Sequence, residues 1–414
     1  MSKQVVSALV VLTVLLYAWS LGQWYQSQKA PAARFVQTFP VSSSFHEHEQ
    51  PLMEEEFIAP SGDIQVHAAS IAQLQDGSLA AVWYGGKYEG APDTQIYFSS
   101  RPLHNLHTLH TLNSPETGWL PPRPIVNRAS ATKELNRYIK TIGNPLLFTD
   151  RDNRLQLLFV TVSVGGWSGS SLNIKISTDA GMTWTRSQRL TLSPFFNVAE
   201  LVRNNPLSLS NGGFVIPIYH ECIGIFSELL WYMPGTGDNI PHYFKTRLTW
   251  GTRYLQPAMV STGPTSAEVF YRSHRDDSHV AISSSNNTGK SWTAPQYIDL
   301  PNPGSGLNAL QLSDNRILLA FNDNPIHRDN LTLAVSNQRP TENTKNTEKQ
   351  GNEFQTWHRV AVLENTPGEE FSYPYMIRTR DGKIHMVYTW QRKRIKHITF
   401  NEAWIEGKIT LNAE

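Results

Sequence analysis

The chain has almost no cysteine, with Cys222 alone among 414 residues. No disulfide can form within the chain, which excludes the small disulfide-stapled secreted domains. Net charge is also nearly absent, at +1, so the molecule carries no overall electrostatic signature of a nucleic-acid-binding protein. Phosphate-binding loops, dinucleotide motifs and nucleophile elbows are missing too. We therefore expect no cofactor, and any cationic site for an anion must be built locally.

Helical periodicity is scarce beyond the N-terminal region, while proline (25) and glycine (26) are frequent. What the chain has instead is a repeated unit of apolar strand, polar turn and apolar strand. The turns carry Asp-Gly, Asn-Gly or Asp-Asn, which are typical of hairpins. Six such units occupy residues 70–84, 145–160, 206–219, 257–271, 309–321 and 374–388. They predict an all-β fold, a six-bladed β-propeller, with a generic β-sandwich as the alternative.

A turn motif recurs between these units. Its complete copy is Ser177-x-Asp179-x-Gly181-x-Thr183-Trp184, and a second copy has Asn287 in place of the aspartate. A third is interrupted by a polar tract, which separates Ser336 from Thr356 and Trp357. The short Asp or Asn side chain can bond its own backbone, and glycine supplies a positive φ. This Asp-box is typical of the outer hairpin of a sialidase-type blade, so it indicates architecture and not catalysis.

The N-terminal region contains the apolar run Val5–Leu21, with aromatic residues at its distal end. We interpret residues 1–25 as a signal anchor in a bacterial inner membrane, with cleavage near residues 29–33 as the alternative. Residues 26–53 are then a polar stalk, and residues 54–414 form the propeller in the periplasm or outside the cell. The acidic segment 54–62 is expected to supply a strand that closes the last blade.

The Asp-boxes, the hairpins and the closing segment 381–397 together resemble the sialidase superfamily, and more closely its bacterial BNR-repeat branch, over about residues 54–404. The resemblance implies an axial funnel that binds an acidic sugar. It also implies three arginines that hold the sugar carboxylate, an aspartate as acid/base, and a tyrosine nucleophile activated by a glutamate. The implied partner is a glycan or polysaccharide that contains an acidic sugar.

Carried over residue by residue, the resemblance gives a mixed result. His67 stands where the first clamp arginine is expected, Asp93 matches the acid/base position, and Tyr373 lies two residues beyond the nucleophile position. A shift of two residues keeps the same strand face, so Tyr373 can still reach the axis. Arginines at the ends of inner strands could rebuild the clamp. These are Arg203, Arg272, Arg392 and Arg394.

Residues 216–232 add a polar cluster on an apolar background, with Tyr219, His220 and Glu221 leaving a strand. Neighbouring residues of a strand face opposite ways, so His220 and Glu221 cannot both face the axis unless the strand bends. Trp83 could stack on a sugar ring, although propeller aromatics are more often core. Histidines 104, 107 and 110 lack a fourth ligand at zinc spacing, so we expect no metal.

Three functions remain open from the sequence. The first is an exported, sialidase-like exo-glycosidase that cleaves a terminal acidic sugar. The second is a uronate-directed lyase, or an unusual exoglycosidase, that uses a central histidine. The third is a catalytically silent glycan-binding propeller. In every case we expect His67, Asp93, Arg272, Tyr373 and Arg392 to converge, joined by His220 or Glu221.

Overall fold

The computed structural model of the protein describes residues 3–27, 33–36, 49–59, 62–103, 118–192, 197, 199–222, 224–235, 242–274, 278–337 and 356–413. Two tracts noted in the sequence lie outside the described residues. They are the histidine-containing tract 104–110 and the polar insertion 339–355, together with much of the predicted stalk 26–53.

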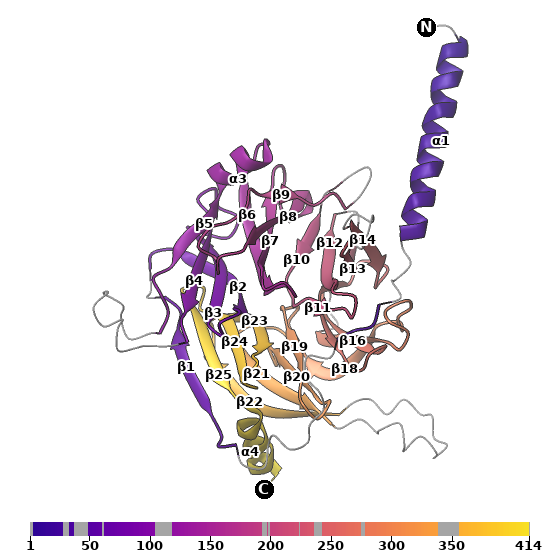
Figure 1. Cartoon of the computed structure of the whole chain (residues 1–414). Helices are drawn as coiled ribbons and strands as arrows, with labels where there is room; N and C mark the ends of the chain where they lie inside the picture. The colour runs from indigo at the N-terminus through magenta and orange to yellow at the C-terminus, as the bar shows by residue number, and fades with distance from the viewer. Residues whose placement is uncertain are drawn as a thin grey trace, which may run out of the picture.

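The described residues form six antiparallel sheets around one axis, as the six hairpin units predict (Figure 1). Each sheet has four strands, except the third, which has five. From the axis outward, blade 1 consists of β2 (Gln65–Gln73), β3 (Leu79–Gly86), β4 (Gln95–Arg101) and β5 (Arg123–Asn127), and blade 2 of β6 (Thr141–Thr149), β7 (Leu155–Val162), β8 (Ser170–Ser177) and β9 (Gln188–Arg189). Blade 3 consists of β10 (Glu200–Val202) with β11 (Leu207–Ser208), β12 (Phe214–Glu221), β13 (Ile225–Met233) and β14 (His242–Arg247), and blade 4 of β15 (Tyr254–Ser261), β16 (Ala267–Ser273), β17 (His279–Ser285) and β18 (Gln296–Pro301). Blade 5 consists of β19 (Asn308–Gln311), β20 (Ile317–Phe321), β21 (Asn330–Ser336) and β22 (Trp357–Asn365), and blade 6 of β23 (Phe371–Arg378), β24 (Ile384–Trp390), β25 (Arg394–Phe400) and β1 (Met53–Phe57).

The N-terminal strand closes the sixth blade, as expected from the acidic segment after residue 53. Strand β1 pairs antiparallel with β25, from Met53 opposite Phe400 to Phe57 opposite Lys396. The carboxylate of Glu56 accepts a hydrogen bond from the Trp119 indole at 3.0 Å, which links β1 to the first blade. The two ends of the propeller are therefore joined by backbone pairing and by a buried side-chain contact.

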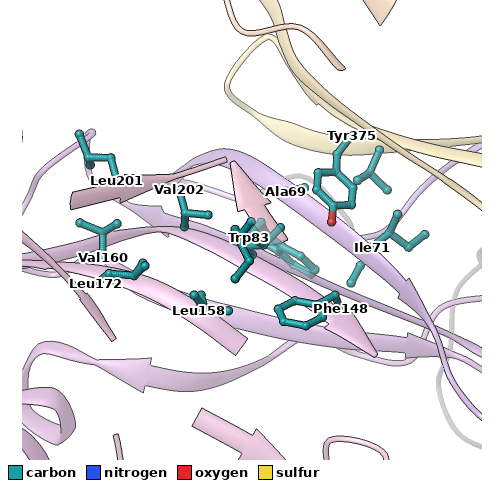
Figure 2. Close-up of a cluster of buried hydrophobic side chains, with 14 of the residues drawn as sticks. Ala69, Ile71, Trp83, Phe148, Leu158, Val160, Leu172, Leu201, Val202 and Tyr375 are labelled. Atoms are coloured by element: carbon teal, nitrogen blue, oxygen red, sulfur yellow. The ribbon is translucent and has the colours of Figure 1, made fainter. Parts of the chain in front are cut away.

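The core lies between the faces of neighbouring blades (Figure 2). Strands β3 and β7 are buried along their whole length, because a blade covers each face. Side chains such as Trp83, Phe148 and Leu158 interdigitate there, and each contributes roughly 1.5–3 kcal/mol by leaving water. This packing fixes how the blades sit around the axis, and with them the ends of the inner strands.

The Asp-boxes form the turns predicted for them. Asp179 accepts hydrogen bonds from the backbone N–H of Thr183 at 2.9 Å and from the hydroxyl of Ser177 at 2.7 Å. Asn287 accepts from the backbone N–H of Ser291 at 3.0 Å. The turns join the third and fourth strands of their blades, far out from the axis. Their role is structural, because Trp184 packs edge-on against Phe98 of the neighbouring blade.

In the described residues three α-helices accompany the sheets: α1 (Lys3–Ser27), α3 (Arg128–Leu135) and α4 (Glu402–Ala413). The predicted N-terminal helix is present as α1, which projects away from the propeller (Figure 1) and exposes apolar side chains such as Leu9 and Trp19. In the described part of the chain, no helix is long and apolar enough to cross a membrane. The predicted membrane anchor is therefore not supported, and export stays a prediction.

Candidate active site

Bulges in the inner strands direct side chains toward the axis. Strands β2, β6, β15 and β23 each change register near their N-terminal end. Each break contains one residue with positive φ: Ala68 (51°), Asn144 (44°), Gln256 (48°) and Tyr373 (58°). Such residues cost about 1–3 kcal/mol each, and they persist where surrounding structure holds them, often at functional sites. The last three each precede a proline.

His67 lies beside the first of these bulges and is 3% exposed. Its ring meets that of Tyr373 with centroids 4.4 Å apart, and that of Tyr84 at 5.7 Å, both edge to face. Burial lowers the pKa of His67 well below its ordinary value, and nearby cations, Arg392 first, lower it further. The imidazole is therefore neutral at pH 7.

Tyr373 is the centre of a chain of hydrogen bonds across the axis. Its hydroxyl accepts from the Gln256 amide at 3.2 Å and from Arg272 at 3.5 Å. The same amide donates to the Tyr219 hydroxyl at 3.3 Å, as does Asn144. These residues come from four different blades, so the chain marks one site at the N-terminal end of the inner strands.

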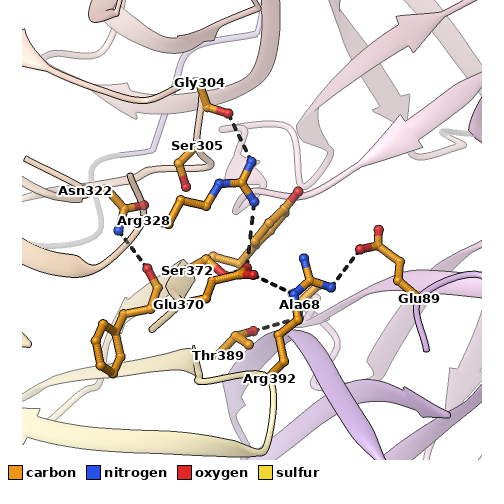
Figure 3. A network of polar contacts seen from close by, with 12 residues as sticks. Ala68, Glu89, Gly304, Ser305, Asn322, Arg328, Glu370, Ser372, Thr389 and Arg392 are labelled. Carbon is orange, nitrogen blue, oxygen red and sulfur yellow. Dashed lines mark hydrogen bonds and ion pairs between the residues drawn. The ribbon is translucent and has the colours of Figure 1, made fainter. Parts of the chain in front are cut away.

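Charged residues extend into this site from the ends of the second strands of five blades, or from the loops that follow those strands. They are Glu89, Glu221, Arg272, Arg328 and Arg392, from blades 1, 3, 4, 5 and 6. Figure 3 shows Arg392 between two carboxylates, with Glu370 at 2.6 Å and Glu89 at 2.9 Å. Arg328 lies 3.7 Å from Glu370 and donates to the Gly304 carbonyl at 3.2 Å. Three guanidinium groups thus lie close enough to His67 to lower its pKa, and one of them, Arg272, also contacts Tyr373.

Two acidic groups of the site have pKa values shifted in opposite directions. Burial would raise the pKa of Glu370, but hydrogen bonds from Arg392 and Ser372 hold it below its ordinary value. Burial raises the pKa of Glu221, an effect that Arg272 opposes and Glu89 strengthens. Of these two carboxyl groups, Glu221 is the one whose pKa is raised, which suits a general acid.

Arg203 lies under the site, where its guanidinium binds backbone carbonyls. It is 2% exposed, and it donates to the Ala69 carbonyl at 3.1 Å and to the carbonyls of Tyr373 and Pro374. Burial lowers its pKa to about 10, so it stays charged at pH 7. Arg203 therefore spans the axis and supports the backbone of Tyr373, and its role in substrate binding stays a prediction.

Three site predictions are wrong. His220 faces away from Tyr219 and Glu221 on β12, and its ring stacks on Phe226 at 4.6 Å. Trp83 packs between blades against Tyr97, because alternation along β3 turns Tyr84 and not Trp83 toward the site. Arg394 lies over the Phe57 ring at 3.5 Å and bonds the Ala59 carbonyl, at the outer side of the last blade.

Asp93 occupies an exposed loop between β3 and β4, and both carboxylate oxygens accept from the Lys87 backbone N–H at 3.3 Å. The same loop carries Glu89, which contacts Arg392. Asp93 therefore caps a turn at the site end of the first blade, and its catalytic role stays a prediction.

Sequence reasoning missed Arg328 and Glu370. Both lie near the axial end of a blade: Arg328 follows the second strand of blade 5, and Glu370 precedes the inner strand β23. A signal for Arg328 was available in the sequence, because Arg272 lies at the end of a second strand and Arg392 follows one. Among the described residues, no three His, Cys, Asp or Glu side chains gather as metal ligands. A cavity of about 460 Å³ lies at the opposite end of the inner strands, lined by Gln73, Thr149, Ser261 and Arg378 among others.

The sequence matches a family model described as a BNR repeat-like domain over residues 77–386. The match spans most of the chain, and the chain belongs to this family, the BNR branch of the sialidase-like propellers that the Asp-boxes indicate. A comparison with curated proteins finds no match.

Solved structures of the same fold include both an unassigned protein and sialidases. A protein of unknown function from Dyadobacter fermentans superposes with a TM-score of 0.61 at 13% identity, covering 84% of this chain and 98% of that one. The intramolecular trans-sialidase from Ruminococcus gnavus gives 0.59 at 13%, covering 82% and 95%. A variant of the NanB sialidase from Streptococcus pneumoniae gives 0.60 at 11%, covering 88% and 72%. At these identities the likeness establishes the fold alone.

Proposed function

We propose that this protein is a glycosidase-type enzyme that cleaves a terminal acidic sugar from a glycan. The observation that carries this proposal is the gathering of Arg272, Arg328 and Arg392 around His67, which packs against Tyr373 at one end of the axis. Guanidinium groups bind carboxylates in a fixed, forked geometry. A chain of net charge +1 that concentrates three of them beside a proton-transfer group is suited to a small carboxylate-bearing substrate.

In this proposal the arginines neutralise the sugar carboxylate, and Tyr373 faces the reacting carbon. Glu221, with its raised pKa, protonates the leaving oxygen, and Asp93 is the alternative donor. The partners of the Tyr373 hydroxyl are the Gln256 amide and the Arg272 guanidinium, and neither donor group can take its proton. Attack by water activated by a carboxylate therefore fits this site better than attack by a tyrosine that a glutamate has deprotonated.

The second candidate is elimination from a uronate, and the neutral His67 favours it. His67 or Tyr373 takes the proton from C5, the C4–O bond breaks, and its electron pair leaves with the oxygen as a C4–C5 double bond forms. An arginine on the carboxylate stabilises the intermediate charge. The balanced products are a shortened glycan and an unsaturated uronate.

The test is to incubate the purified full-length protein with sialosides and uronides and to identify the products by mass. A free acidic sugar supports hydrolysis, an unsaturated uronate supports elimination, and binding without turnover contradicts both and supports the lectin alternative. His67→Ala and Arg272→Gln should each reduce kcat/KM by roughly 100-fold or more. Arg394→Gln, an arginine outside the site, is the matched control and should keep wild-type turnover. Full activity of His67→Ala would remove His67 from the mechanism.

A further inference from the structure

Five buried polar atoms of side chains that contact Tyr373 have no hydrogen-bond partner among the described residues. They are both ring nitrogens of His67, Oε1 of Gln256, and the Nε atoms of Arg272 and Arg203. An unpaired buried polar atom is destabilising, so folded proteins pair the great majority of them. These atoms come from three blades, and each belongs to a side chain that contacts Tyr373. Their concentration in one place indicates groups that a ligand completes.

The chemistry of each unpaired atom states what the ligand must offer. Nε of Arg272 is a donor and requires an acceptor, which a carboxylate provides. Oε1 of Gln256 is an acceptor and requires a donor, since the amide nitrogen already donates to Tyr373 and Tyr219. A neutral imidazole has one donor and one acceptor nitrogen. A hydroxyl group both donates and accepts, so it satisfies Gln256 and His67.

The identity of residue 67 sharpens this requirement. The sialidase resemblance implies a clamp arginine there, and a guanidinium offers donors only, which suits a carboxylate. The neutral imidazole in its place cannot form an ion pair with a carboxylate, but it can exchange hydrogen bonds with a hydroxyl. The site therefore has one cation fewer on the His67 side and a hydroxyl-binding group in its stead.

We propose that the acidic sugar is a terminal hexuronic acid, with its carboxylate on Arg272 and a ring hydroxyl between His67 and Gln256. This inference rests on the function proposed above. A hexuronic acid carries its carboxyl group on C5 and a hydroxyl on the neighbouring ring carbon C4. In sialic acid the carboxyl group is on the anomeric carbon, and the neighbouring C3 is a methylene that can neither donate nor accept.

A ligand must also gain access to these atoms, which are shielded from solvent in this structure. Arg392 lies close to His67, and its side chain, 25% exposed, is bound by Glu89, which is 35% exposed. On its way to Arg272, the ligand carboxylate competes with Glu89 for the guanidinium of Arg392. Displacement of this partly exposed carboxylate opens the path to His67.

The first experiment measures binding of the purified full-length protein by calorimetry. The probes are methyl β-D-glucuronide, methyl β-D-glucoside, which lacks the carboxylate, and N-acetylneuraminic acid. We expect the glucuronide to bind at least ten times more tightly than the other two. Equal or tighter binding of N-acetylneuraminic acid overturns this inference and leaves the proposed function standing. If neither acidic sugar binds or is cleaved, the proposed function fails as well.

The second experiment exchanges the hydroxyl-binding groups. Gln256→Leu should weaken glucuronide binding at least tenfold, because it removes a hydroxyl-binding group while the carboxylate contact with Arg272 remains. His67→Arg should shift the preference toward N-acetylneuraminic acid. His67→Gln keeps one donor and one acceptor, so it should retain most of the preference. His220→Gln, a histidine outside the site, is the control. Melting temperatures establish that each variant is folded, and an unchanged preference in folded Gln256→Leu and His67→Arg overturns the hydroxyl assignment.

Discussion

At the scale of single residues, Gln256 and His67 distinguish this site from the one that the sialidase resemblance implies. There a glutamate activates the tyrosine, whereas here the group 3.2 Å from the Tyr373 hydroxyl is an amide. There an arginine opens the first inner strand, whereas here a neutral imidazole packs on the tyrosine ring. Both changes replace a charge by a neutral group that donates and accepts hydrogen bonds. The fold is thus retained while the charge pattern at the reacting centre differs.

Buried histidines should make the folded protein sensitive to acid. Burial lowers the pKa of His385 to about 3, and it also lowers the pKa values of His67 and His397. An unfolded histidine titrates near about 6.5, so below that pH the unfolded chain binds protons that the folded chain does not. The free energy of unfolding should therefore be highest above about pH 6.5 and should fall as the pH drops toward 3.

Urea unfolding at pH 7.5, 6 and 5 measures this dependence. In His385→Asn one such group is removed, so the slope of stability against pH should be shallower by up to one proton. His358→Asn changes an exposed histidine and should leave the slope as in the wild type. A slope in His385→Asn that matches the wild type would show that His385 is protonated in the folded state.

At the scale of elements, the Asp-box depends on acceptor geometry and not on charge. Asp179 and Asn287 occupy equivalent places and accept from corresponding backbone N–H groups, at 2.9 and 3.0 Å. We therefore predict that Asp179→Asn keeps the turn, whereas Asp179→Ala loses its acceptor and lowers the melting temperature by a few degrees. Neither change should alter turnover, since the turn is remote from Tyr373.

The contribution of the Asp179 turn to the free energy of unfolding also depends on pH. Here the charged form of the side chain is the stabilised one, whereas for the buried histidines it is the neutral form. Hydrogen bonds from Thr183 lower the pKa of Asp179 to about 2. The stabilisation is present above about pH 3.8, the ordinary value, and is lost as the pH falls through 2. At neutral pH, thermal melts of the two variants decide the prediction, and equal losses in Asp179→Asn and Asp179→Ala would refute the acceptor argument.

At the scale of the whole molecule, the sequence predicts the fold well because its signals are local. Strand alternation, turn residues and the Asp-box each act within about ten residues, and their repetition implies the propeller. His67, Tyr373 and Arg272 also follow from the sequence, because inner strands and the exits of second strands meet at the axis.

The rest of the site depends on information that is not local. The contact of Glu370 with Arg328 joins two blades, and no sequence pattern around either residue indicates this contact. Which of two neighbouring residues faces the site, such as Tyr84 or Trp83, depends on the register of the strand, and a shift of one residue turns every side chain to the other face. The structural role of Arg203 is missed for a related reason, since only the assembled propeller shows that its guanidinium binds carbonyls of two other blades.

The last prediction concerns where the molecule works. The apolar run Val5–Leu21 is the sequence feature that motivates it, and the lone Cys222 is compatible with an oxidising compartment because no disulfide pairing is required. We predict that the propeller is exported from a bacterial cytoplasm. A reporter enzyme that requires disulfides, fused after Glu414, should be active in the full-length fusion and inactive when residues 1–27 are deleted.

Leu12→Arg, which places a charge inside the run, should reduce export, whereas Gln26→Arg beyond it should not. Activity of the deleted form, or of a reporter that works only in the cytoplasm, would contradict export. The N-terminal sequence of the exported protein then separates an uncleaved anchor from cleavage near residues 29–33.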